Sequence, residues 1–463
     1  MKKIFDKFIV AMFCSPQPPA EKNGRKFPNK ITLEQYLRAK ELGFTTVYGH
    51  NEIVNTDTEK YAFEALELAE KAGLDYLVKD SIAEEYISLG NRGYRPFSLL
   101  SEREKRKLDE RFAQSLARYS DYPAFAGITF FDEPGSDSFE GIARAKKVFD
   151  RVCGDKLFYV NLMPYYITPE QYQYGYVTDA RKFTDENYAY SRPNYQRYVH
   201  YLDKYIRTEP DVLSYDVYPY VNYGSLTDTI HEGLYDMLGL FFEYSRRYSL
   251  PFMPYCQAGG EWEGGSARKV TDAEMRHQIN ISLLFGARGI QFFPYCFPND
   301  WLDSPNDRCG AIDCDGRPTD TAASIKKALG VLKNLGSVLI KSTLKGIMSV
   351  GEFDGKYSAE MLKNVEWSQT IFQGNIPHGE RYMLKSISDI ERAEASSQVL
   401  IGEFDSGFLL VNNSIKREAS VHLKLRQTTC VTLISDKKLQ VAADELNITL
   451  DGGDAVFIAR PNQ

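Results

Sequence analysis

The chain has 463 residues, of which 43% are hydrophobic and 26% are charged. This length exceeds one ordinary core and the composition excludes extensive disorder, so we expect two or three globular domains. The 56 basic and 63 acidic residues give a formal net charge of −7. There is no basic block, which argues against nucleic acid and anionic membranes as partners.

Cysteine usage and apolar segments bear on the compartment. No segment approaches about 20 apolar residues, so no membrane span is expected. The N-terminal segment 1–14 is interrupted by Asp6 and lacks a small-residue cleavage site, unlike a signal peptide. Seven isolated cysteines, an odd number, suit reduced thiols better than a disulfide framework. We therefore expect a cytoplasmic protein, and a homo-oligomer stays open.

Strand-like and helix-like segments alternate through the first ~340 residues. The expected strands are Phe8–Cys14, Phe44–Tyr48, Asp75–Val78, Phe125–Phe131, Leu157–Leu162, Val212–Val217, Pro251–Tyr255 and Gly289–Phe293. The expected helices are Leu33–Leu42, Lys60–Ala72, Glu102–Tyr119, Ser138–Val152, Tyr195–Ile206, Thr229–Tyr248, Asp272–Phe285 and Thr321–Ile340.

Eight strands, each followed by a helix, predict a (β/α)8 barrel over residues 1–343. A doubly wound sheet is the alternative, but no G-x-G-x-x-G follows the first strand. Two segments are too long for minimal loops: Pro164–Asn194, which is rich in tyrosine, and Phe297–Asp320. Long loops on the catalytic face of a barrel usually form binding walls.

From residue 344 to 463 the pattern changes to short alternating runs, such as Gly407–Asn412 and Leu446–Leu450. These runs predict a small all-β domain, a sandwich of antiparallel strands. Asp451-Gly-Gly-Asp454, between two such runs, favours a hairpin turn. We expect this domain to be a structural cap on the barrel, with independent sugar binding as the alternative.

The tetrapeptide Asp132-Glu133-Pro134-Gly135 comes directly after the apolar run 124–131. That run is expected to be a buried strand, so the two carboxylates would stand at its C-terminal end. In barrels of parallel strands this end carries the chemistry. Pro134 ends the strand and restricts the conformation of Glu133. The plain alternative is a solvated acidic turn.

A barrel whose fourth strand ends in Glu-Pro resembles the large clan of (β/α)8 glycoside hydrolases that contains β-galactosidases and cellulases. In that clan the fourth strand ends in Asn-Glu-Pro, and its glutamate is the general acid/base. The resemblance implies that role for Glu133 and places Asp132 where the clan has an asparagine that bonds a sugar hydroxyl. An aspartate accepts such a bond but cannot donate one.

The resemblance also implies a nucleophilic glutamate at the end of strand seven, where this chain has Gln257. Glutamine can neither attack an anomeric carbon nor activate water. Our preferred second carboxylate is Glu261, in the glycine-rich loop 259–265, which could close over a ligand. Asp216, where strand six ends, is the rival. A carboxylate separation of ~5–5.5 Å would imply retention and ~6.5–9.5 Å inversion.

Polar and aromatic residues near the other strand ends form a ring that suits carbohydrate, whose hydroxyls need donors and acceptors and whose C–H faces need aromatic platforms. The expected substrate-binding residues are Asp132, His50, Glu52, Lys79, Asn161, Tyr218, Gln257, Trp262 and Trp301. Within the resemblance, Trp301 lies a little beyond the tryptophan that floors the donor subsite.

The sequence therefore predicts a glycoside hydrolase that cleaves small oligosaccharides or glycosides with two carboxylates and no cofactor. Metal motifs such as H-E-x-x-H are absent, and so is the G-x-S-x-G elbow. One alternative is a non-catalytic carbohydrate-binding barrel, supported by Gln257. Another is a lyase or aldolase that forms a Schiff base through Lys79.

Overall fold

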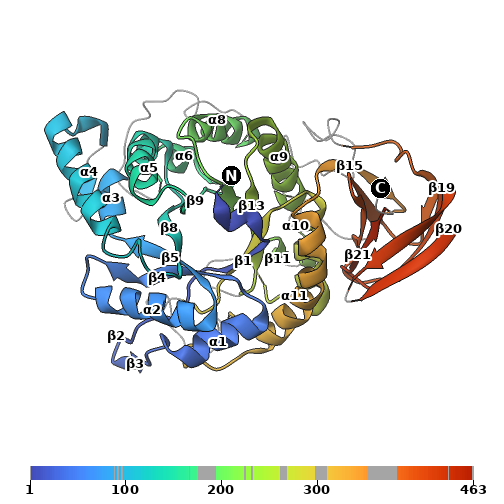
Figure 1. Cartoon of the computed structure of the whole chain (residues 1–463), viewed down its shortest axis with the longest axis horizontal. Coiled ribbons are helices and arrows are strands. Elements are labelled where there is room, and N and C mark those ends of the chain that lie inside the picture. Colours follow the sequence, from blue (N-terminus) through green and yellow to red (C-terminus); the bar gives the residue numbers. More distant parts are fainter. Residues whose placement is uncertain are drawn as a thin grey trace.

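A computed structural model describes residues 2–87, 89–90, 93–94, 97–165, 167–175, 194–223, 226–230, 233–260, 268–297, 310–352, 383–435 and 437–460. Figure 1 shows a ring of strands inside a ring of helices, with a separate β domain beside it. The fold class expected from the sequence is confirmed.

Eight parallel strands form the barrel in the order β10-β13-β14-β1-β4-β5-β8-β9. A parallel bridge between Leu162 and Tyr215 closes the ring. Leu162 directly follows β9, and Tyr215 is the last residue of β10. All eight strands fall where the sequence places them: β1 (Ile9–Met12), β4 (Thr46–Val54), β5 (Asp75–Asp80), β8 (Phe125–Asp132), β9 (Leu157–Asn161), β10 (Leu213–Tyr215), β13 (Phe252–Gln257) and β14 (Gly289–Phe293).

The helices that cover the barrel also agree with the sequence pattern, except that the helix expected from Thr229 begins at Gly233, because Leu226–Ile230 forms a strand. They are α1 (Leu33–Leu42), α2 (Glu59–Ala72), α4 (Glu102–Leu116), α5 (Phe139–Cys153), α8 (Asn194–Ile206), α9 (Gly233–Tyr248), α10 (Asp272–Leu284) and α11 (Asp320–Leu339). Local chemistry sets their ends. The side chain of Thr271, for example, accepts a hydrogen bond from the Glu274 N–H in a capping box that starts α10.

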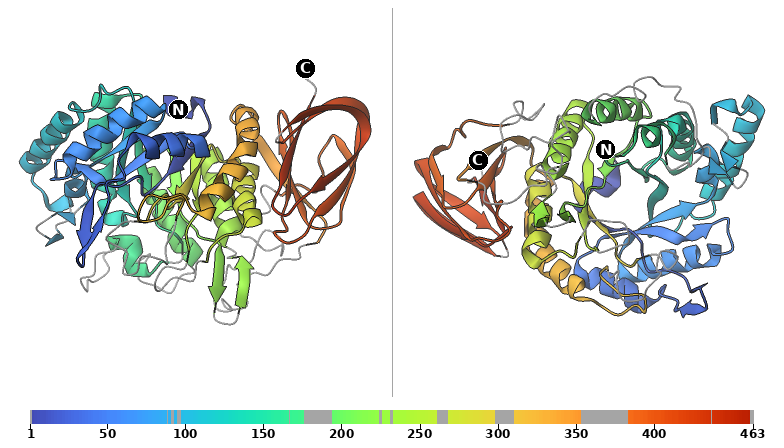
Figure 2. Two further views of the ribbon diagram at one scale, coloured as in Figure 1. Left: turned by 90° about the horizontal axis from the view of Figure 1, so that it is seen from below. Right: turned by 180° about the vertical axis from the view of Figure 1, so that it is seen from behind.

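The two ends of the barrel differ. The short helix η1 (Lys3–Asp6) lies across the centre of the ring in Figure 1, and its Ile4 and Phe5 are buried in the barrel interior. The hairpin β11 (Tyr220–Tyr223) and β12 (Leu226–Ile230) projects on the opposite side with α6 (Pro169–Tyr174), as Figure 2 shows. The open face at the C-terminal ends of the strands is therefore the face available for a site.

Shorter elements fill the loops. They are β2 (Ala20–Lys22), β3 (Arg25–Phe27), α3 (Ile82–Tyr86), β6 (Leu89–Gly90), β7 (Gly93–Tyr94), η2 (Phe97–Leu99) and η3 (Ser136–Ser138). In the second barrel strand, β4 runs six residues past the expected end at Tyr48, with a register shift against β5 between Tyr48 and Ile53. This irregular stretch carries His50, Asn51 and Glu52.

The C-terminal part is all antiparallel. Its seven strands are β15 (Leu344–Val350), β16 (Ile390–Ala395), β17 (Val399–Phe404), β18 (Gly407–Asn412), β19 (Ala419–Ile434), β20 (Lys438–Leu450) and β21 (Ala455–Ala459). The long strand β19 pairs with β16, β20 and β21, so the sheet curls around its own apolar core (Figure 2).

The expected hairpin at Asp451–Asp454 is wrong, because β20 pairs with β19 whereas β21 pairs with β18 and β19. The turn instead docks on α10. A Cβ on Gly453 would lie 2.3 Å from the Ala273 carbonyl, and its φ of 72° favours glycine. The Asn280 amide donates to the Gly453 carbonyl at 2.8 Å, so this turn fixes the β domain to the barrel.

Candidate active site

Glu133 follows the last residue of β8, and its backbone is unusual. A residue before proline normally takes an extended conformation, but Glu133 has φ of 52°, in the left-handed region. Such a conformation costs on the order of 1–3 kcal/mol and persists only where neighbours impose it. The Glu133 N–H donates to the Asn161 carbonyl at 2.9 Å, and the Tyr201 hydroxyl donates to the Pro134 carbonyl at 2.7 Å.

Three carboxyl groups gather where β8, β9 and β10 end. The Asn161 amide, Nδ2, donates to Asp132 Oδ1 and to Asp216 Oδ1, both at 3.1 Å. Asp216 is 6% exposed and is also hydrogen-bonded to the Glu133 carboxyl. A hydrogen bond between two carboxyl groups needs a proton on one of them. The structure therefore brings Asp132, Glu133, Asn161 and Asp216 together.

The electrostatics of these groups follow from their surroundings. Burial, then the nearby charge of Asp132, raises the pKa of Asp216 to about 7, although hydrogen bonds from Asn161 and Glu133 oppose the shift. Asp132 faces solvent, but protein encloses it closely enough that lost hydration raises its pKa too, against the Asn161 bond and the charge of Lys79. The hydrogen bond from Glu133 lowers the pKa of Asp216, so Glu133 is the donor, and we expect the pair to hold one proton near neutral pH.

A polar layer inside the barrel supports this cluster. The Ser214 hydroxyl donates to Asn161 Oδ1 at 2.9 Å, and the Gln291 amide donates to the Ser214 oxygen at 2.9 Å. The Tyr159 hydroxyl lies 2.8 Å from that of Ser214 and donates to the Tyr255 hydroxyl at 3.0 Å. Because Ser214 fixes the oxygen of the Asn161 amide, its NH2 group must point at the carboxylates. No sequence motif marked this layer.

A cavity of about 240 Å³ opens beside Asp132 at the ends of β4, β5 and β8. His50, Lys79 and Asp132 line it together with the rings of Phe13 and Tyr159. Burial, followed by the positive charge of Lys79, lowers the pKa of His50 to about 3, so the imidazole is neutral at neutral pH. Of the residues expected to bind sugar, these three share one cavity.

A relay of side chains fixes the tautomer of His50. Gln17 donates its amide to the Cys296 and Phe297 carbonyls at 3.2 and 2.9 Å, which leaves its oxygen to accept from Asn51 Nδ2 at 2.9 Å. Asn51 Oδ1 must then accept from His50 Nδ1–H, also at 2.9 Å. His50 Nε2 therefore carries the lone pair. Sequence reasoning placed Asn51 beside His50 at the end of the second strand but missed Gln17, which reaches a carbonyl 280 positions away.

Two expected site residues have their polar groups engaged elsewhere. Glu52 is fully buried, and its carboxylate accepts from Ser15 at 2.8 Å and Tyr76 at 2.6 Å. Burial raises the pKa of Glu52. Gln257 is also fully buried, and its amide donates to the Tyr220 and Arg268 carbonyls at 3.1 and 2.6 Å. Both side chains therefore stabilise neighbouring segments of the chain through these hydrogen bonds.

The remaining expected residues are placed as follows. Tyr218 is half-buried, and its ring centroid lies 5.4 Å from that of Phe293 at the end of β14. Glu261, Trp262 and Trp301 lie outside the described residues, so their roles stay predictions.

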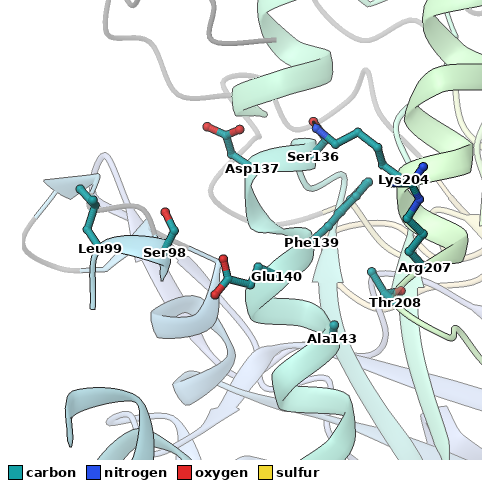
Figure 3. Close-up of a pocket in the computed structure, with 10 residues that line it drawn as sticks. All are labelled: Ser98, Leu99, Ser136, Asp137, Phe139, Glu140, Ala143, Lys204, Arg207 and Thr208. Atoms are coloured by element: carbon teal, nitrogen blue, oxygen red, sulfur yellow. Dashed lines mark hydrogen bonds between the residues drawn. The ribbon is translucent and has the colours of Figure 1, made fainter. Parts of the chain in front are cut away.

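A second cavity, of about 560 Å³, lies on the outer wall between α5 and α8 (Figure 3). Asp137 and Glu140 come from the α5 side, whereas Lys204 and Arg207 come from the end of α8. Lys204 Nζ donates to Ser136 Oγ at 3.2 Å. No residue of the carboxyl cluster lines this cavity, so the two are separate.

The residues in the ranges that the structure describes carry neither a metal-binding cluster nor a membrane-spanning helix. Within them, no group of three or more His, Cys, Asp or Glu side chains is arranged to hold a metal ion. No helix in the same ranges combines the length and apolarity that crossing a bilayer requires.

A (β/α)8 barrel followed by an antiparallel β domain is the fold of a class of glycoside hydrolases, and solved structures of that class match this chain. It is similar to the β-galactosidase from Bacillus circulans sp. alkalophilus, with a TM-score of 0.56 at 10% identity over 99% of this chain and 100% of that one. It is also similar to a glycoside hydrolase family 5 protein from Bacteroides vulgatus ATCC 8482, with a TM-score of 0.51 at 11% identity over 98% and 88% of the two chains.

The β-galactosidase from the psychrophilic Marinomonas ef1 has a TM-score of 0.49 at 11% identity, and this chain covers 63% of its length. No protein-family model matches the sequence, and no curated protein does. The comparisons therefore establish the fold.

Proposed function

We propose that this protein is a glycoside hydrolase acting on small oligosaccharides or glycosides, with Glu133 as the general acid/base. The observation that carries the proposal is the gathering of the Asp132, Glu133 and Asp216 carboxyl groups around Asn161 at the C-terminal ends of the barrel strands, with Glu133 hydrogen-bonded to Asp216. One proton is shared there near neutral pH, and a glycosidic oxygen needs such a donor as its bond breaks.

The other groups take supporting roles in this proposal. Asp216 shares one proton with Glu133. The Asn161 amide donates to both Asp216 and Asp132 and so sets the distance between them. His50, Lys79 and Asp132 bind the sugar, with Tyr218, Trp262 and Trp301 as further contacts. Glu261 remains our preferred second carboxylate, acting from the loop after β13. The barrel over 1–343 does the chemistry, and 344–463 is its structural cap.

A second candidate function is a carbohydrate-binding barrel without hydrolysis. The observation that favours it is Gln257 at the end of β13, where the resembled clan has its nucleophile, with its amide committed to two backbone carbonyls. Such a protein would bind saccharides through the same cavity and release them unchanged.

Turnover of a panel of 4-nitrophenyl glycosides and natural disaccharides tests the first proposal. Glu133→Gln should lower kcat/KM by about 10²–10⁴-fold, the usual contribution of a general acid. The chain provides a matched control, because Glu209 also precedes a proline and has φ of 55°, but it is exposed just after the C-terminal end of α8. Glu209→Gln should leave turnover unchanged.

Two results would contradict this assignment. Full turnover by the Glu133→Gln protein would remove Glu133 from the mechanism. Calorimetric binding of saccharides with no hydrolysis over days would favour the binding protein instead.

A further inference from the structure

Lys79 is a cation at the end of β5 whose charge no near neighbour neutralises. It is half-buried and lines the 240 Å³ cavity. Among the described residues it makes no hydrogen bond and no ion pair. Its charge nevertheless acts on two groups of the same cavity, because it adds to the lowering of the His50 pKa and opposes the rise in the Asp132 pKa that burial causes.

Asp132 is the complementary group. Its Oδ1 accepts from Asn161 at 3.1 Å, and Oδ2 has no partner within the described part of the chain. The ammonium and the carboxylate therefore line one cavity and influence each other electrostatically without forming an ion pair. Two opposite charges that line one cavity without an ion pair leave a place for a group that accepts from one and donates to the other.

The charges around the cavity determine whether an anionic, a cationic or a neutral ligand group is favoured there. An anionic ligand would face Asp132 and Glu84, which both line the cavity, and a cationic ligand would face Lys79. A neutral hydroxyl meets neither repulsion, and it is both an acceptor and a donor. An ammonium only donates and a carboxylate only accepts, so a hydroxyl satisfies the two at once.

We infer that Lys79 and Asp132 jointly bind one hydroxyl of a neutral sugar ring, which makes Lys79 a specificity-determining residue of the site. This rests on the proposed function for the sugar itself. The lysine supplies the donor that an aspartate lacks, and the pair thus does the work of a single carboxamide. His50 Nε2 adds an acceptor for a neighbouring hydroxyl, and the Phe13 ring offers an apolar surface.

The size of the cavity fits one ring. Its 240 Å³ corresponds to roughly eight water molecules at about 30 Å³ each. A single sugar ring would displace those waters and replace their hydrogen bonds with the ones just described.

A double-mutant cycle tests the inference by calorimetry, with methyl glucoside, methyl galactoside, their monodeoxy analogues and glucuronic acid as probes. Lys79→Met should weaken binding of a neutral probe by about tenfold or more, as expected for a hydrogen bond to a charged group. In the Asp132→Asn background the same substitution should cost less than about threefold, because an asparagine amide both donates and accepts.

Further arms separate this inference from its rivals. Lys79→Arg keeps a donor and should retain most of the affinity, and Lys204→Met in the outer-wall cavity should change nothing. The monodeoxy analogue that lacks the hydroxyl bound by Lys79 and Asp132 should bind the wild type weakly. Its affinity should not fall further in the Lys79→Met variant, so this analogue identifies the hydroxyl. Thermal melting of each variant confirms that it is folded.

Three results would overturn the inference: equal losses from Lys79→Met in both backgrounds, selective binding of glucuronic acid that depends on Lys79, or no binding of any probe. These measurements need no catalysis. Binding as expected without turnover would therefore contradict the hydrolase proposal and leave the role of Lys79 standing.

Discussion

Asn161 donates its side-chain amide to Asp216, with Nδ2 3.1 Å from Oδ1, and the same nitrogen bonds Asp132 at the same distance. One planar group thus sets the spacing of two carboxylates from different strands. The hydrogen bonds from Asn161 favour the ionised form of both carboxyl groups. At Asp216, burial opposes ionisation more strongly than this hydrogen bond favours it. The balance leaves Asp216 with a pKa of about 7, where a proton is both held and given up.

The first prediction concerns the pH dependence of activity. In the wild type, kcat/KM should fall as the pH rises through about 7, because the Glu133–Asp216 pair then loses its shared proton. Asp216→Asn removes the anionic neighbour of Glu133, so Glu133 should release its proton at lower pH. The basic limb of a kcat/KM profile from pH 4 to 9 should move down by at least about one unit. An unmoved limb would separate Asp216 from the proton donor.

The same residue should cost stability at neutral pH. Its pKa is raised on folding from 3.8 to about 7, so its contribution is fully present below pH 4 and is lost as the pH rises through 7. At about 1.4 kcal/mol per pKa unit the loss is up to roughly 4 kcal/mol. Asp216→Asn should therefore raise the urea midpoint at pH 8 and do little at pH 4. A variant that is less stable at both values would refute this.

The substitution Gln257→Glu would place a glutamate where the resembled clan has its nucleophile, but we expect it to destabilise the protein without increasing turnover. The Gln257 amide donates to the Tyr220 and Arg268 carbonyls, and a carboxylate would leave both unsatisfied while burying a charge. Thermal unfolding should show a loss of several kcal/mol, with no gain in turnover. Gln171→Glu, which keeps the capping box of α6, is the neutral control. Increased turnover would return the nucleophile to β13.

His277, between barrel and β domain, should make the fold sensitive to acid. Its Nε2 lies 2.9 Å from Asn413 Oδ1, which must accept because the Asn413 amide donates to Gln398, and burial lowers the pKa of His277 from 6.5 to about 4. Between these values the unfolded chain binds a proton that the folded chain does not, so stability falls as the pH drops from 6.5 to 4, by up to roughly 3 kcal/mol. Unfolding free energies of wild type and His277→Gln should converge over that range. A constant difference would contradict this origin.

The Gln17 relay should matter for binding although Gln17 does not line the His50 cavity. Gln17→Met would free Asn51 to turn over, so that His50 Nε2 is no longer held as an acceptor. Saccharide affinity should drop several-fold, and the unsatisfied Cys296 and Phe297 carbonyls should cost about 1–3 kcal/mol of stability. Nitrogen-15 NMR of the histidine ring should show mixed tautomers. An unchanged single tautomer would show that other contacts orient His50.

The sequence predicted all eight barrel strands, because buried parallel strands are short apolar runs and each is followed by an amphipathic helix. It also placed Glu133 and Asp216 at strand ends, and strands four and six both end on the catalytic face. The spacing of strands along the chain carries that information.

Other features depend on contacts that no local pattern encodes. Gln17 donates to the Phe297 carbonyl, 280 positions away. The Gln257 amide donates to the Tyr220 and Arg268 carbonyls, which only the folded chain brings beside it. The left-handed φ of Glu133 runs against the rule for residues before proline, since neighbouring strands outweigh local preference. The long strand β19 continues across a register shift between Lys424 and Thr429, which no alternating run along the chain indicates.

The barrel and the β domain share part of their apolar interior, although the β domain also has a core of its own. One apolar core runs from the barrel helices to Leu400, Leu409 and Phe457 of the C-terminal sheet, and α10 packs on β17 and β18. Removing the β domain would expose an apolar face of α10 to water. Heating should accordingly melt the chain in a single cooperative transition, and the β domain should not be exchangeable as a module between barrels.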